Sequence, residues 1–130
     1  MEKTKLSLRV LIVEDDTSIG FYFKRILLHQ GHTVTLAASG DKAKDFYNNK
    51  TADIVICDHV LPGGNGAELM KWIKERFPQT YCILISGYYN ESFKKYLSPD
   101  CADEVSPKPV TREMIDMFIE NYIRSGKKIV

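Results

Sequence analysis

The amino-acid sequence predicts an α/β fold, a doubly wound parallel sheet of five strands with five helices that complete three layers. The first observation is that five short apolar runs alternate with five stretches of helical character along the chain. The second is that the strongest runs, at residues 8–13, 53–57 and 81–85, are mainly apolar without helical spacing, as strands covered on both faces are. The third is that the connections are short, which favours right-handed crossovers between parallel strands.

Each element has a local reason. The two remaining strands, residues 33–37 and 102–105, are shorter and more polar, as edge strands tend to be. Helix boundaries are indicated by capping residues and by prolines, which stop a helix at the residue before them. On these signals the expected helices are 17–30 (ending at Gly31), 39–49 (with Ser39 as N-cap), 67–77 (before Pro78), 90–97 (before Pro99) and 111–124 (with Thr111 as N-cap).

Length and composition predict one domain over residues 1–130, with its core at about 8–124. The net charge of +1, without a long single-sign run, argues against direct nucleic-acid binding. The chain start lacks a signal-peptide core, and no apolar run approaches the ~20 residues that cross a bilayer, so we expect a cytoplasmic protein without membrane contact. The three cysteines, Cys57, Cys82 and Cys101, show no metal-binding spacing and are expected to be reduced core thiols.

The residues that can carry chemistry follow the predicted strands. In open parallel sheets ligands bind outside the carboxyl ends of the strands, so the positions just after each strand form the predicted site. These positions hold several carboxylates, one hydroxyl and one amine: Glu14, Asp15 and Asp16 after the first strand, Asp58 after the third, Ser86 after the fourth and Lys108 after the fifth.

Grouped carboxylates repel one another, and a hard divalent cation relieves this repulsion. Mg²⁺ prefers oxygen ligands and is typically held by one or two carboxylates together with phosphate oxygens. Lys108 and Ser86 would face the charge that the metal leaves on a phosphoryl group, and Asp58 is the candidate nucleophile. Glycines 63, 64 and 66 allow the loop after Asp58 to pass close to this site.

The segments LIVEDD, ICDHVLPGGNG, LISG and SPKP, in this order and at these spacings, resemble the receiver domain of bacterial response regulators over about residues 8–124. The resemblance implies a flavodoxin-like fold with strand order 2-1-3-4-5. It implies that Glu14, Asp15, Asp58 and the backbone carbonyl of Val60 bind Mg²⁺. It also implies that Asp58 accepts a phosphoryl group, that Ser86 is the switch hydroxyl and that Lys108 binds the phosphoryl group. Lys108-Pro109 is then a candidate cis peptide.

The resemblance further implies that the donor is a phosphohistidine on a sensor histidine kinase or a histidine phosphotransfer protein. The switching face would be formed by the fourth helix, the fifth strand and the fifth helix. An output domain or target protein, and a homodimer through that face, are implied as options. The domain would be no enzyme toward other substrates, because it catalyses only its own phosphorylation and dephosphorylation.

Several residues have a plainer interpretation. Asp16 is expected to cap the first helix, and His59 to be an ordinary loop or surface histidine whose side chain points away from Asp58. Phe21, Tyr22 and Leu28 lie beyond the core stripe of the first helix, and either an exposed partner surface or wider core burial explains them.

Some positions depart from the family pattern. Val105 stands where most receiver domains have an aromatic residue, and Pro107 before Lys108 is uncommon. Residues 90–97 are polar, which predicts a mobile segment. Bulky side chains at Val60 and Tyr88 would flank the path of a hydrolytic water, which suggests slow loss of phosphate.

Two other functions are open at this point. The first is an interaction module that works without phosphorylation, which the departures at Val105 and Pro107 favour. The second is a phosphatase with an aspartyl nucleophile, which is disfavoured because Val60 occupies the place of its acid/base carboxylate.

Overall fold

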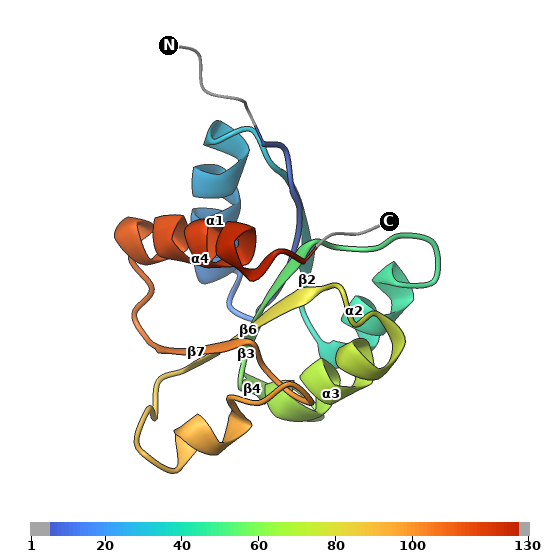
Figure 1. Cartoon of the computed structure of the whole chain (residues 1–130), viewed down its shortest axis with the longest axis vertical. Coiled ribbons are helices and arrows are strands. Elements are labelled where there is room, and N and C mark those ends of the chain that lie inside the picture. Colours follow the sequence, from blue (N-terminus) through green and yellow to red (C-terminus); the bar gives the residue numbers. More distant parts are fainter. Residues whose placement is uncertain (1–5, 128–130) are drawn as a thin grey trace.

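The structure, a computed structural model, describes residues 6–127 (Figure 1). Five parallel strands form the central sheet in the order β2-β1-β3-β6-β7, which is the predicted order 2-1-3-4-5 when strands are counted along the chain. The sheet strands are β1 (Arg9–Val13), β2 (Thr33–Ala37), β3 (Ile54–Asp58), β6 (Tyr81–Ser86) and β7 (Glu104–Pro107).

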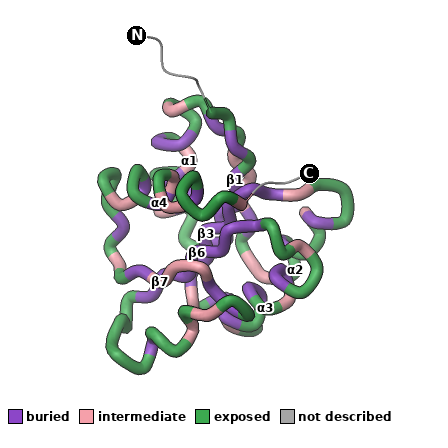
Figure 2. Tube along the Cα trace, in the orientation of Figure 1, coloured by how far each residue is buried: buried purple, intermediate pink, exposed green. Residues whose placement is uncertain are grey.

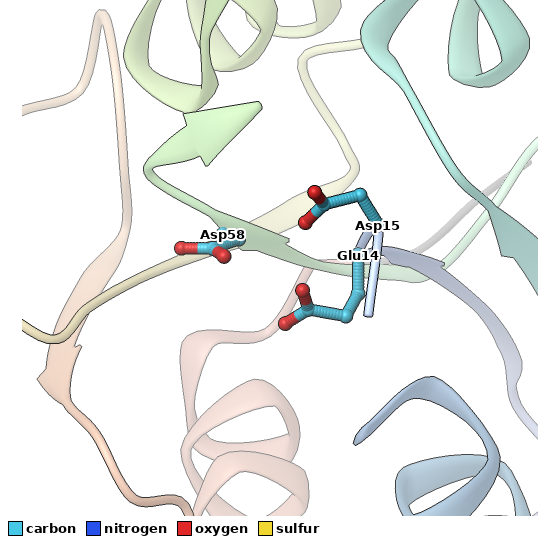
Figure 3. A group of neighbouring side chains, drawn as sticks. All are labelled: Glu14, Asp15 and Asp58. Carbon is cyan, nitrogen blue, oxygen red and sulfur yellow. The ribbon is translucent and has the colours of Figure 1, made fainter. Parts of the chain in front are cut away.

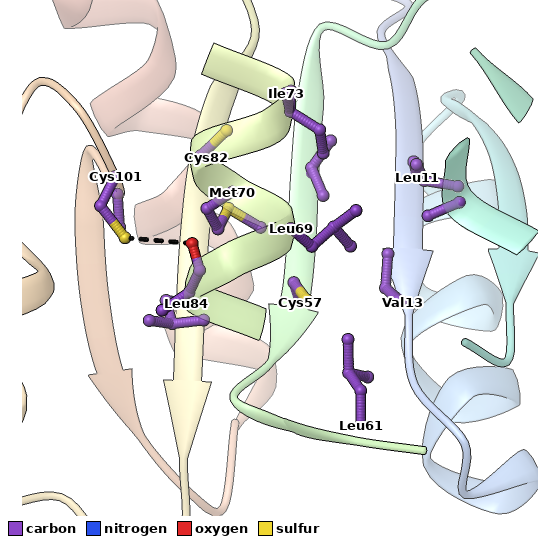
Figure 4. Close-up of a cluster of buried hydrophobic side chains, with 14 of the residues drawn as sticks. Leu11, Val13, Cys57, Leu61, Leu69, Met70, Ile73, Cys82, Leu84 and Cys101 are labelled. Atoms are coloured by element: carbon purple, nitrogen blue, oxygen red, sulfur yellow. Dashed lines mark hydrogen bonds between the residues drawn. The ribbon is translucent and has the colours of Figure 1, made fainter. Parts of the chain in front are cut away.

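Two pairs of helices cover the sheet, one pair on each face, and the burial of the sheet between them is visible in Figure 2. Because side chains alternate along a strand, Val10, Ile12 and the residues of β3 that pair with them point to the face covered by α1 and α4. The opposite face carries Leu11, Val13 and Cys57, and it packs against α2 and α3 (Figure 4). The helices are α1 (Thr17–His29), α2 (Gly40–Phe46), α3 (Gly66–Arg76) and α4 (Arg112–Ser125).

The capping predictions are confirmed where the structure contains a helix. The Ser39 side chain accepts a hydrogen bond from the backbone N–H of Lys42, and Thr111 caps α4 in the same way. Gly31 follows α1 with φ of 95°, a left-handed conformation that glycine adopts without a Cβ clash. The three cysteines are buried and free, as predicted.

The predicted fourth helix, residues 90–97, is wrong. Only a 3-10 helix, η1 (Phe93–Tyr96), forms in this segment, so residues 6–127 contain four α-helices rather than five. Its N-cap residue Ser92 makes no side-chain capping bond, and Phe93 is the one buried residue within η1. Too little apolar surface is buried to stabilise a longer helix.

The fifth strand begins two residues later than predicted. The Asp103 carboxylate accepts a hydrogen bond from the backbone N–H of Cys82, where a regular strand would offer a backbone carbonyl. The loop after β3 also contains an unpredicted hairpin, β4 (Val60–Leu61) and β5 (Gly64–Asn65). Within residues 6–127, no helix is long and apolar enough to span a bilayer.

Candidate functional site

The candidate site lies at the carboxyl edge of the sheet, where neighbouring strands end level with one another. Val13 of β1 pairs with Cys57 of β3, and Asp58 lies beside Ile85 of β6. Ser86 in turn pairs with Pro107 of β7. This register brings the residues that follow β1 and β7 to the same edge as the ends of β3 and β6.

Three carboxylates come together at this edge. Glu14, Asp15 and Asp58 each offer an oxygen, and these oxygens lie within 4.8 Å of one another (Figure 3). Burial raises the pKa of Glu14, the charge of Asp58 adds to this rise, and a hydrogen bond from the Asp16 backbone N–H opposes it. Like charges are therefore held together in a partly dry site, at a cost in stability.

Lys108 supplies the opposite charge. Its Nζ donates to Oδ2 of Asp58 over 2.9 Å and lies 3.7 Å from Oε1 of Glu14. Burial lowers the pKa of Lys108, but the hydrogen bond to Asp58 and the nearby carboxylates outweigh burial and raise it, so the amine is a cation. The Lys108-Pro109 peptide bond is cis, as the resemblance implied.

The backbone around Asp58 is tightly fixed. The N–H of the next residue, His59, donates to Ile85 O over 2.8 Å, and its carbonyl accepts from the N–H of Gly66 over 2.7 Å. A Cβ on Gly66 would lie 2.3 Å from the Asp58 carbonyl oxygen and 2.8 Å from Leu84 Cδ1. Only glycine fits this contact. The sequence indicated a glycine in this loop, but not that its close contact with the Asp58 carbonyl fixes the end of β3.

Ser86 is the last residue of β6 and Val60 the first of β4, and each makes a hydrogen bond that was not predicted from the sequence. The Ser86 hydroxyl is buried and accepts the backbone N–H of Tyr88 over 3.0 Å, a bond within its own loop. Val60 donates its backbone N–H to Asp58 Oδ1 over 3.4 Å, while its side chain is exposed. Tyr88 is 84% exposed, so neither bulky side chain is packed into the core.

Two residues near the site, Asp16 and His59, had a plainer interpretation. Asp16 caps α1 by accepting the Ile19 N–H, as expected. His59 lies in the connection between β3 and β4, as expected for a loop histidine, but its ring packs against Phe93 and Tyr96. A residue after a strand gives no sequence signal for such a contact.

The outer face of α1 is exposed. Phe21, Tyr22 and Leu28 are 55%, 47% and 48% exposed, so wider core burial is the wrong explanation for them. A groove of about 750 Å³ runs between α1 and the start of α4. Its lining includes Tyr22, Pro109 and Lys108, and Lys108 also contacts Asp58 in the carboxylate site.

The donor set fits a hard divalent cation. Three carboxylate oxygens within 4.8 Å of one another, with one amine beside them, carry more negative than positive charge. Oxygen ligands of this kind are those that Mg²⁺ takes.

Comparison with known proteins agrees with this geometry. The family model described as "Response regulator receiver domain" matches residues 10–120. The chain is 32% identical over 119 residues to the sensor kinase CckA of Brucella abortus and 29% identical to the transcriptional regulatory protein AfsQ1 of Streptomyces coelicolor. The matches cover 90% and 92% of this chain but 13% and 52% of those relatives, so the chain spans about half their length or less.

Solved structures show the same fold. A CheY-like response regulator receiver domain protein from Methanospirillum hungatei is 27% identical with a TM-score of 0.81, and covers 93% of this chain and 100% of its own. The receiver domain protein from Clostridium thermocellum, also 27% identical, has a TM-score of 0.82 over 94% and 98% of the two chains. The chain therefore belongs to the receiver domain family of two-component response regulators.

Proposed function

We propose that Asp58 accepts a phosphoryl group and that Lys108 and Ser86 hold that group in the modified protein. The observation that carries this proposal is the 2.9 Å contact of Lys108 with Asp58 inside a group of three carboxylates. An aspartate with an amine at hydrogen-bonding distance can attack phosphorus while the amine neutralises charge on the phosphoryl oxygens.

Glu14, Asp15, Asp58 and the backbone carbonyl of Val60 would hold Mg²⁺. When bound, the cation supplies charge neutralisation and orientation for the phosphoryl group. It also relieves the repulsion among the carboxylates, which Lys108 relieves only in part.

The transfer needs little else from the protein. An Asp58 oxygen attacks phosphorus, the bond from phosphorus to the donor's imidazole nitrogen breaks, and that nitrogen keeps the electron pair and takes up a proton. Lys108 is placed to follow the developing negative charge. The Ser86 hydroxyl then turns from its own loop to donate to a phosphoryl oxygen.

The donor we propose is the phosphohistidine of a sensor histidine kinase or histidine phosphotransfer protein. Its helices would pack on the exposed residues of α1 and over the groove that Lys108 helps to line. Tyr22→Ala should slow transfer from the donor protein and leave modification by acetyl phosphate unchanged. Equal slowing by both donors would count against this docking site.

The signal would leave through η1, β7 and α4, toward an output domain, a target protein or a second copy. Addition of about −1.5 to −2 charges at Asp58 is the switching event, and a partner shifts the population only by its differential affinity. A single folding unit over residues 1–130 and a cytoplasmic location remain predictions.

The test is modification of a single residue. Incubation with acetyl phosphate and Mg²⁺, followed by intact mass, should show one added phosphoryl group on the wild type and none on Asp58→Asn. Asp16→Asn is the matched control, because Asp16 is an exposed acidic residue next to Asp15, and asparagine also caps helices. It should be modified like the wild type; modification of Asp58→Asn would overturn the assignment.

A second function, an interaction module independent of phosphorylation, is favoured by Val105 and by the short η1. Beryllofluoride with Mg²⁺ separates the two, because it mimics an aspartyl phosphate. An amide spectrum of the wild type that does not change would support the module and contradict phosphorylation.

A further inference from the structure

An aromatic cluster outside the carboxylate site joins the acceptor strand to the segment around η1. We define it as His59, Tyr89, Phe93 and Tyr96. The ring of His59 lies 5.4 Å from that of Phe93 and 5.0 Å from that of Tyr96, between centroids. Phe93 also contacts Tyr89 at 5.5 Å and Tyr96 at 5.7 Å, so it is the centre of the cluster.

Both ends of the aromatic cluster are attached to the candidate site. His59 follows Asp58 in the chain, and its backbone is held by hydrogen bonds to Ile85 and Gly66. At the other end, Tyr89 follows Tyr88, whose N–H donates to the Ser86 hydroxyl. A continuous path of contacts therefore runs from the acceptor through the aromatic cluster to the switch hydroxyl.

Within the segment from Tyr88 to Leu97, Phe93 is the one buried residue of η1, and the Phe93 N–H donates to the Asn90 side chain of the same segment. Tyr96 joins the segment to the rest of the protein, because its ring packs partly buried against the core and its carbonyl accepts the N–H of Ala102. Glu91 and Lys94 form an exposed ion pair within the segment, which does not hold it to the sheet. Displacement of η1 would therefore change the packing of Phe93 and Tyr96 on His59.

Packing, rather than a hydrogen bond at Nδ1, holds the ring of His59. Among the described residues, Nδ1 of His59 is the one buried side-chain nitrogen or oxygen without a hydrogen-bond partner. A buried polar atom without a partner is unfavourable, and a phenyl ring would fill the same place without that cost.

We propose that His59 is a positioning residue for switching, and that the aromatic cluster couples the modification of Asp58 to the position of residues 88–97. This inference rests on the proposed function. When the Ser86 hydroxyl turns toward the phosphoryl group, either its hydrogen bond with the Tyr88 N–H breaks or Tyr88 moves with it. In both cases Tyr89 shifts against Phe93. Because Phe93 contacts His59, whose backbone is fixed beside Asp58, residues 88–97 move together relative to His59.

The test compares amide spectra with and without Mg²⁺ and beryllofluoride, in the full chain. In the wild type, shifts are expected both in the acceptor loop, residues 60–66, and in residues 88–97. In His59→Ala the acceptor-loop shifts should remain, while those of residues 88–97 fall by more than half at saturation. His59→Phe keeps a ring and should restore them.

Controls separate coupling from damage to the fold. Phe77→Ala removes a partly buried ring on the same core face, one that contacts Tyr47 and Trp72, and it should leave both sets of shifts intact. If His59→Ala does not fold, Phe93→Leu retains apolar volume without the ring and should give the same loss.

The outcomes are distinct. Full shifts of residues 88–97 in folded His59→Ala or Phe93→Leu would overturn the coupling and leave phosphorylation standing. Loss of these shifts in His59→Phe as well would show that ring packing is not the coupling. No shift anywhere in the wild type would instead mean that the proposed function itself fails, and this inference with it.

Discussion

Replacement of Gly66 by alanine should damage the acceptor site through the backbone. The added Cβ would lie 2.3 Å from the Asp58 carbonyl oxygen, whereas ordinary contact begins at 3.4 Å, so the two must separate by about 1.1 Å. Leu84 Cδ1, at 2.8 Å, limits movement of the Cβ in another direction. The backbone at Asp58 must therefore move, away from the position at which Lys108 contacts the carboxylate.

Two effects follow, and each has a magnitude. Overpacking of this kind costs about 1–3 kcal/mol of unfolding free energy, which corresponds to a fall in Tm of roughly 4–12 °C for a domain of this size. A displacement of about 1 Å at the reacting group slows chemistry by about 100-fold. The rate of modification by acetyl phosphate, followed by intact mass below the Tm, should therefore fall far more than the folded fraction does.

The matched control is Gly64→Ala in the same loop. No heavy atom lies within 4 Å of a Cβ there, and its φ is not positive, so this variant should resemble the wild type in Tm and rate. If Gly66→Ala matches Gly64→Ala in both measurements, the backbone contact does not position the acceptor and the reasoning is refuted.

Three further predictions concern charge, pH and lifetime. Lys108→Met leaves its two carboxylate partners unpaired and should lower the free energy of unfolding in EDTA by about 1–3 kcal/mol, less than for a fully buried pair because the lysine is 29% exposed. Added Mg²⁺ should recover most of this loss, as measured by urea unfolding. Equal stability of the variant and the wild type in EDTA would contradict the prediction. Burial lowers the pKa of His32 below 6.5, so the unfolded chain binds more protons and stability should fall as pH decreases from about 6.5. His32→Asn, whose side-chain oxygen can accept the same backbone hydrogen bond, should lose that dependence between pH 7.5 and 5.0; parallel slopes would count against burial as the cause. Alanine at both Val60 and Tyr88 should shorten the lifetime of the phosphorylated protein several-fold in a mass time course, and an unchanged lifetime would remove the proposed shielding of water.

The sheet, its order and the acidic and basic residues of the site could be predicted from the sequence. Apolar runs such as residues 53–57 identify buried strands because a strand covered on both faces needs apolar side chains at every position. Once the strands are parallel, Glu14, Asp58 and Lys108 must arrive at one edge. Local capping bonds at Ser39 and Thr111 were predictable because they involve residues three apart.

Tertiary packing decided the rest. Residues 90–97 form only η1, in which Phe93 is the one buried residue, and helix length depends on burial of this kind. The ring contacts of His59 and the fit of Gly66 against Asp58 join segments whose proximity no local pattern encodes. Strand periodicity and chain order thus determine which residues reach the site, whereas close packing between distant segments determines how each is held there.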